Sequence, residues 1–197
     1  MRPRPIIGVA ITTMALVGGC TVKPVPTATF TSAPPPTTTP APGPVKYASA
    51  SFRSCPEIQQ KVPGLPPALK AEPTRSSDEF GLTCTFITSE GGGSVLMINF
   101  DVALYENRPD SAGVERAKLA FSNSTQTGAE KDASVNLGSD ARWLDPGVGP
   151  SCRLQTLDAN VVLMTRYSRS KEVDPRSEEC RSEARVVAKQ LFDAIQP

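Results

Sequence analysis

Cysteine is the residue type in this chain that is best able to carry chemistry, and the 197 residues include 5 Cys and no His. Without His, no Ser-His-Asp triad, Cys-His pair or His-ligated metal site can form within the chain. Four of the cysteines, Cys55, Cys84, Cys152 and Cys180, are widely spaced, with no CxxC pair among them. This spacing argues against a metal site.

The fifth cysteine, Cys20, ends a segment that has the pattern of a secretory signal. Arg2 and Arg4 precede an uncharged, mostly apolar stretch over residues 6–17. Its 12 residues are too few for a membrane-spanning helix, which needs about 20. Residues 17–20 read Val-Gly-Gly-Cys and resemble the bacterial lipobox. The resemblance implies cleavage between Gly19 and Cys20, a diacylglycerol on the Cys20 thiol, and a fatty acid such as palmitate on the new amine.

A lipidated Cys20 would hold the chain on the extracytoplasmic face of the cell membrane, because several acyl chains together anchor firmly. Two alternatives remain open, an ordinary cleaved signal with an incidental cysteine and an uncleaved anchor helix. In an oxidising compartment the other four cysteines predict two disulfides, for which three connectivities are possible. We therefore interpret residues 1–19 as a lipoprotein signal peptide.

Residues 20–50 are expected to be a disordered tether behind the lipidated cysteine. Between Thr21 and Lys46 there are 8 Pro and 7 Thr and no acidic residue. Such a segment has too little apolar surface to offset the entropy lost on ordering. Its proline pairs favour an extended polyproline conformation, so the tether would hold a domain away from the membrane.

Residues 51–197 are expected to form one globular domain. Four of the 21 basic residues and none of the 20 acidic residues precede residue 51, which leaves the domain with 17 basic residues and a net charge of −3. That charge provides no basic surface for nucleic acid, so we expect no nucleic-acid partner.

Apolar periodicity over residues 51–197 predicts three helices and five strands. The first helix begins at Ser54 as N-cap with Pro56 in its first turn, and the last begins at Asp174 as N-cap with Pro175 in its first position. The elements between them are expected over residues 82–87, 95–105, 109–122, 133–144, 152–156 and 161–167. The last helix carries a core-facing stripe, formed by Cys180, Ala184, Val187, Leu191 and Ile195.

The predicted order of elements is α-β-β-α-β-β-β-α. Two hairpins are expected, one across the glycine-rich turn at residues 90–93 and one across residues 157–160. Because hairpins need no crossover helix, we predict an α+β fold with a mainly antiparallel sheet packed against helices. Cys180 would tie the last helix to the strand that carries Cys152.

Several short motifs in residues 51–197 resemble an actinobacterial, mycobacterial-type family of exported lipoproteins grouped as a domain of unknown function. They are Ser54-Cys55-Pro56; residues 81–86, similar to G-x-x-C-x-W with Phe86 in place of Trp; residues 137–143, similar to LGDxAxW with Ser139 as a departure; and the pair Ser151-Cys152-Arg153 and Glu179-Cys180-Arg181. The resemblance implies a location in the cell envelope and the sequential disulfides Cys55–Cys84 and Cys152–Cys180. A related resemblance is to disulfide-bonded extracellular sensor domains of receptor Ser/Thr kinases, and neither resemblance transfers a catalytic residue.

One enzymatic pattern, S-x-x-K at residues 168–171, is typical of penicillin-binding enzymes. The S-D-N and K-T-G motifs that accompany it in those enzymes are absent from the sequence, so we expect Ser168 and Lys171 to lie in a solvated loop. For Trp143, the only Trp, two positions are open, the lining of a pocket and the core; we favour the core, with the indole N–H hydrogen-bonded. We therefore expect that the chain is not an enzyme and that it has no catalytic site, metal site or cofactor.

The leading functional hypothesis is a membrane-anchored extracytoplasmic binding or interaction module with an unidentified ligand. Its partner would be an envelope protein, glycan or lipid, and its oligomeric state is open. One alternative is a carboxylate-dependent cell-wall hydrolase, which would need two acids facing each other across a cleft. Another is a sensor-like extracytoplasmic domain.

Overall fold

The structure is a computed structural model of the chain that describes residues 45–69, 74–75, 79–89, 94–132, 134–147, 149–169 and 173–197. The expected signal peptide, Cys20, the tether up to residue 44, the glycine turn at residues 90–93 and Lys171 lie outside the described residues. No helix in the described ranges has both the length and the apolar character that a membrane span requires.

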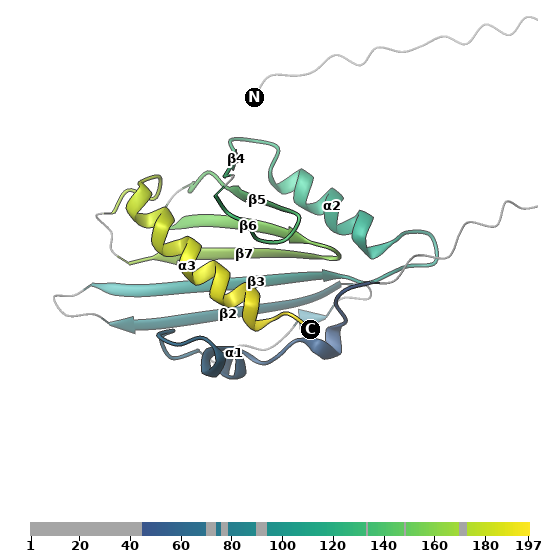
Figure 1. Cartoon of the computed structure of the whole chain (residues 1–197), viewed down its shortest axis with the longest axis horizontal. Coiled ribbons are helices and arrows are strands. Elements are labelled where there is room, and N and C mark those ends of the chain that lie inside the picture. The colour runs from purple at the N-terminus through teal and green to yellow at the C-terminus, as the bar shows by residue number, and fades with distance from the viewer. Residues whose placement is uncertain are drawn as a thin grey trace, which may run out of the picture. The chain divides into compact units, whose positions relative to one another are not determined.

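Among the described residues, seven strands form one antiparallel sheet in the order β1-β2-β3-β7-β6-β5-β4 (Figure 1). Their bounds are β1 Thr74–Arg75, β2 Glu79–Ser89, β3 Val95–Tyr105, β4 Glu130–Lys131, β5 Asp140–Trp143, β6 Cys152–Asp158 and β7 Val161–Ser168. The two predicted hairpins, β2–β3 and β6–β7, form the centre of the sheet, where β3 pairs with β7. The predicted α+β fold with a mainly antiparallel sheet is confirmed.

The α-helices cover both faces of the sheet unequally. On one face lie α1 (Cys55–Lys61) and α3 (Glu178–Ala194), and α3 crosses the central strands in Figure 1. Alternate residues of β3, from Ile98 to Leu104, point into the large core on this side because side chains of a strand alternate between faces. On the other face, α2 (Gly113–Ser124) packs Phe121 against the sheet in a smaller cluster.

Two disulfides join helices to strands on the large-core face. Cys55 of α1 bonds Cys84 of β2, with their Cα atoms 5.4 Å apart. Cys152 of β6 bonds Cys180 of α3, with their Cα atoms 6.2 Å apart. The sequential pairing that the family resemblance implies is therefore confirmed. By restricting the unfolded chain, each bridge stabilises the fold by about 2–4 kcal/mol.

The predicted starts of two helices are wrong. The last helix begins at Glu178, and its N-cap is Ser177, whose hydroxyl accepts a hydrogen bond from the Cys180 N–H at 3.3 Å. Asp174 instead accepts from the Arg176 N–H at 2.9 Å and stabilises a turn that leads into the helix. The helix predicted from residue 109 begins at Gly113, because residues 108–111 close a short backbone-bonded turn.

The strand predicted over residues 133–144 is wrong in extent, since of the described residues 134–144 only Asp140–Trp143 form a strand. The connection from β4 to β5 runs close to β6 through Gly138, which has φ of 61°. A Cβ atom on Gly138 would lie 2.3 Å from the carbonyl oxygen of Leu157. The close approach and the positive φ both require glycine at this position.

The folded domain begins before residue 51, where we expected the tether to end. Tyr47 is only 1% exposed and packs in the large core. Its hydroxyl donates to Asp158 at 2.5 Å, and its backbone N–H donates to the side chain of Asn160 at 3.0 Å. Burial, followed by the Asp158 carboxylate, raises the pKa of Tyr47 above its ordinary value. Residues 45–50 are thus held on the β6–β7 hairpin.

Candidate functional site

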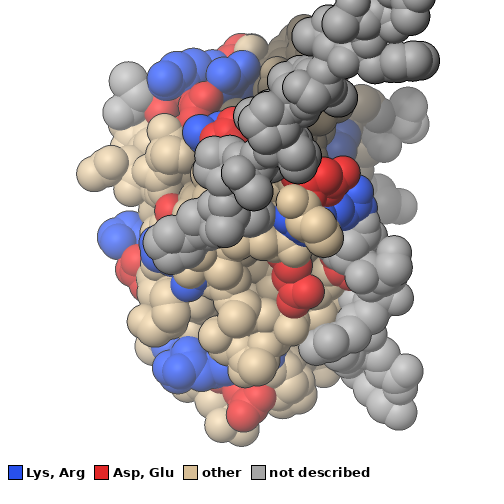
Figure 2. All heavy atoms as spheres, turned by 90° about the vertical axis from the view of Figure 1, so that its right-hand side faces the viewer, with Lys and Arg blue, Asp and Glu red and all other residues tan. Residues whose placement is uncertain are grey.

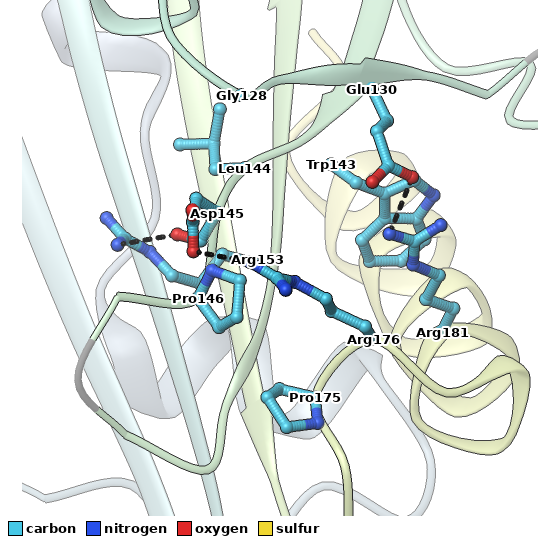
Figure 3. A pocket seen from close by; sticks show the side chains of 10 residues that line it. All are labelled: Gly128, Glu130, Trp143, Leu144, Asp145, Pro146, Arg153, Pro175, Arg176 and Arg181. Carbon is cyan, nitrogen blue, oxygen red and sulfur yellow. Dashed lines mark hydrogen bonds and ion pairs between the residues drawn. The ribbon is translucent and has the colours of Figure 1, made fainter.

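A cavity of about 230 Å³ lies where β5 and β6 meet the start of α3. Its walls come from the β4 region, β5, the loop after β5, β6 and α3 with its preceding turn (Figure 3). Here it is named the arginine pocket, and it is lined by Gly128, Glu130, Trp143, Leu144, Asp145, Pro146, Arg153, Pro175, Arg176 and Arg181. Three positive and two negative side chains give this lining a net charge of +1.

The disulfide between β6 and α3 places two of these arginines. Arg153 directly follows Cys152, and Arg181 directly follows Cys180. Because the two cysteines are bonded, their neighbours are held at the same cavity although 28 residues separate the cysteines in sequence. The third arginine, Arg176, lies in the turn that precedes α3.

Asp145 lies between Arg153 and Arg176 (Figure 3). Its carboxylate accepts from the Gly147 N–H at 3.1 Å and from Arg176 at 3.2 Å, and its carbonyl oxygen accepts from Arg153 at 3.3 Å. The Gly147 N–H and then the Arg176 charge lower the pKa of Asp145. Asp145 is therefore ionised near neutral pH.

The opposite wall of the arginine pocket is an ion pair beside an aromatic ring. Arg181 contacts the carboxylate of Glu130 at 2.8 Å. The Arg181 guanidinium also lies 5.3 Å from the centre of the Trp143 ring, within the range of a cation–π interaction. Trp143 is the only Trp of the chain, so its fluorescence can report on this wall.

Behind this wall lies Asp132, in the loop that follows β4. Its hydrogen bonds connect that loop to β5 and to α3. Its carboxylate accepts from the Trp143 indole N–H at 2.8 Å and from Arg185 at 2.7 Å. Arg185 also pairs with Glu178 at 2.5 Å. Although burial raises the pKa of Asp132, hydrogen bonds from Ser134, Trp143 and Arg185 lower it well below its ordinary value. This network ties the Trp143 wall of the arginine pocket to α3.

A second hollow, of about 430 Å³, lies between the end of α1 and the last turns of α3. Its charged lining consists of Lys61 and Asp193. Asp193 is already paired with Lys189 at 3.0 Å, an exposed pair within α3. This hollow gathers fewer charged groups than the arginine pocket, which is therefore the better candidate for a ligand site.

The structure agrees with the prediction for one residue singled out from the sequence and disagrees for another. Trp143 is 2% exposed with its N–H bonded to Asp132, as predicted. Ser168 is the last residue of β7 and is buried, so the solvated loop predicted there is wrong at this residue. In the described part of the chain, no group of three or more His, Cys, Asp or Glu could hold a metal ion.

Sequence reasoning did not single out Arg153, Arg176, Arg181 or Asp145 as pocket residues. The usable signal was the Cys-Arg dipeptide, which occurs at both ends of one disulfide. Searches against family models, curated proteins and solved structures find no match for the chain.

Proposed function

We propose that this chain is a membrane-anchored envelope lipoprotein whose domain is an extracytoplasmic binding module, with the arginine pocket as its ligand site. The observation that carries the proposal is the convergence of three arginines from β6, α3 and the preceding turn on one cavity. Binding pockets characteristically combine a concave shape with a few placed polar groups.

The proposed location rests on two independent features of the chain. The N-terminal segment has the charge, length and cysteine position of a lipoprotein signal. The two disulfides suit an oxidising compartment outside the cytosol, because cytosolic thiols are kept reduced. Cys20 would then be the lipidated first residue of the mature chain, cleaved from Gly19.

Binding is favoured over the alternative of a carboxylate-dependent hydrolase. Glu130 and Asp145 do line one cavity, but a hydrolase needs one carboxylic acid whose pKa is raised so that it can donate a proton. The pKa of Asp145 is lowered instead, and Glu130 is held by Arg181. Both carboxylates are arranged to orient guanidinium groups.

The fluorescence of Trp143 provides the test. Fractions of small molecules extracted from the cell envelope are added to the purified chain. We expect one fraction to give a saturable, reversible change, and its components to have unchanged masses after incubation. No saturable response from any fraction would contradict a binding module, and new cleavage products would favour the hydrolase.

A further inference from the structure

We propose that the arginine pocket binds an oxyanionic group, a carboxylate or phosphate, through its arginine side chains. The proposal deepens the proposed function and rests on its assignment of this cavity as the ligand site. It specifies the charge and the chemistry of the group that is recognised.

The lining of the arginine pocket leaves one positive charge uncompensated, since three arginines face two carboxylates. Arg181 pairs with Glu130, and Arg176 pairs with Asp145. Arg153 pairs with no carboxylate among the described residues, and its hydrogen bond goes to the carbonyl oxygen of Asp145. A guanidinium group with a free share of its five N–H donors is the side chain best matched to a carboxylate or phosphate.

Two arginines of the lining also have unmet hydrogen bonds. The Nε atoms of Arg153 and Arg181 are both buried, and neither has a hydrogen-bond partner. A buried donor without an acceptor is unfavourable, and such groups in native proteins call for a physical reason. An oxyanion that enters the arginine pocket would supply an acceptor to either Nε once that side chain changes rotamer.

One resident acid, Asp145, can give way to a ligand. Asp145 and Arg176 have side chains that are 55% and 60% exposed. An ion pair at such a surface contributes little, because water screens both charges. An incoming oxyanion can therefore replace Asp145 beside Arg176 at small cost.

The size of the cavity limits what enters. Its volume of about 230 Å³ is below the range of about 300–1,000 Å³ that encloses a drug-sized ligand. The arginine pocket thus suits a small acid, or the acidic end of a larger molecule such as a lipid headgroup.

The test uses inorganic phosphate as the probe and the whole mature protein, from residue 20 onward, in a neutral detergent. Phosphate is titrated into the protein while sodium chloride keeps the ionic strength constant, and the titration is then repeated at higher ionic strengths. Trp143 fluorescence and calorimetry are the readouts. We expect saturable binding that weakens as the salt concentration rises. Arg153→Gln should weaken phosphate binding about tenfold or more, since a charged, hydrogen-bonded contact is lost.

Lys118→Gln is the matched control. It removes the same charge from an exposed i,i+3 pair on α2, which packs on the opposite face of the sheet from α3. Lys118→Gln should bind phosphate as the unmodified chain does. Unfolding curves of both variants confirm that the fold is retained. Absence of phosphate saturation in the unmodified chain, or equal affinity in the Arg153→Gln variant, would overturn the proposal.

A second arm identifies the source of the oxyanion. The chain with Cys20→Ser, which cannot carry the anchor, is mixed with vesicles of phosphatidylglycerol or phosphatidylcholine. Binding to phosphatidylglycerol vesicles but not to phosphatidylcholine vesicles, with loss of binding in the Arg153→Gln variant, supports a lipid headgroup as the ligand. Binding of phosphate without binding of vesicles supports a soluble acid. A response to envelope fractions without phosphate binding would overturn the oxyanion proposal and leave the binding module standing.

Discussion

Replacing Asp132 tests whether its network with Trp143 and Arg185 stabilises the fold behind the arginine pocket. The Asp132 side chain is only 16% exposed, and it accepts hydrogen bonds from Trp143, from Ser134 and from Arg185. The Asp132→Asn substitution removes the negative charge. It also replaces one accepting oxygen with an NH₂ group, which would face the N–H and O–H donors that the carboxylate now binds. Breaking a buried charged pair costs about 3–5 kcal/mol. Because Arg185 keeps its ion pair with Glu178, its charge is not left unpaired in the variant. We therefore expect a smaller loss, of about 2–4 kcal/mol, in the free energy of unfolding.

The pH dependence of that loss has a definite sign. The folded-state pKa of Asp132 lies below its ordinary value, so the stability that it contributes is present at neutral pH. It is lost as the pH falls below the unfolded-state pKa of about 3.9 and towards the folded-state pKa. The difference between the unmodified chain and Asp132→Asn should therefore shrink under acid conditions.

Urea unfolding followed by far-UV circular dichroism measures both effects. Asp110→Asn is the control, because Asp110 is exposed and its carboxylate accepts a hydrogen bond only from the adjacent Ser111 hydroxyl among the described residues. Two results would refute the reasoning. One is an unfolding free energy for Asp132→Asn that is within about 0.5 kcal/mol of the unmodified value, as for a neutral surface substitution. The other is a difference that does not change with pH.

Three further variants test the fold around the site. Tyr47→Phe removes the hydroxyl that donates to Asp158 and should cost about 1–3 kcal/mol in urea unfolding; an unchanged midpoint would place residue 47 outside the domain. Gly113→Ala should cost about 1–3 kcal/mol in the same assay, because its Cβ would lie 2.1 Å from a backbone carbonyl oxygen, and a neutral result would contradict the close approach of α2 to β3. Replacing Cys152 and Cys180 by Ser should cost about 2–4 kcal/mol and abolish phosphate binding, and retained binding would show that the disulfide does not position the arginines.

Periodicity predicted the three helices and the strands β2, β3, β5, β6 and β7, but not the two-residue strands β1 and β4. Alternation along residues 95–105 reflects a strand with one face in the large core, and the stripe on α3 reflects a helix packed on that core. Strand β7 is buried on both faces, because α2 packs on the side opposite the large core. The start of α3 was harder, because Asp174 and Ser177 are both good N-caps. Ser177 is the N-cap in the fold, and Asp174 caps the preceding turn.

The arginine pocket could not be predicted from spacing alone. Its walls come from segments that only the sheet pairing and a disulfide bring together. Charged residues such as Arg153 are common on exposed strand faces, so a single arginine carries no signal. The packing of Tyr47 was missed for a similar reason, since its partners Asp158 and Asn160 lie more than a hundred positions away in the chain.

The intact mass of the membrane-extracted mature chain, before and after reduction, tests lipid anchoring and oxidation together. We predict a chain that begins at Cys20 and carries diacylglycerol and an added acyl group, with four cysteines that react with an alkylating reagent only after reduction. An unmodified Cys20, with four thiols that react without reduction, would contradict the envelope lipoprotein.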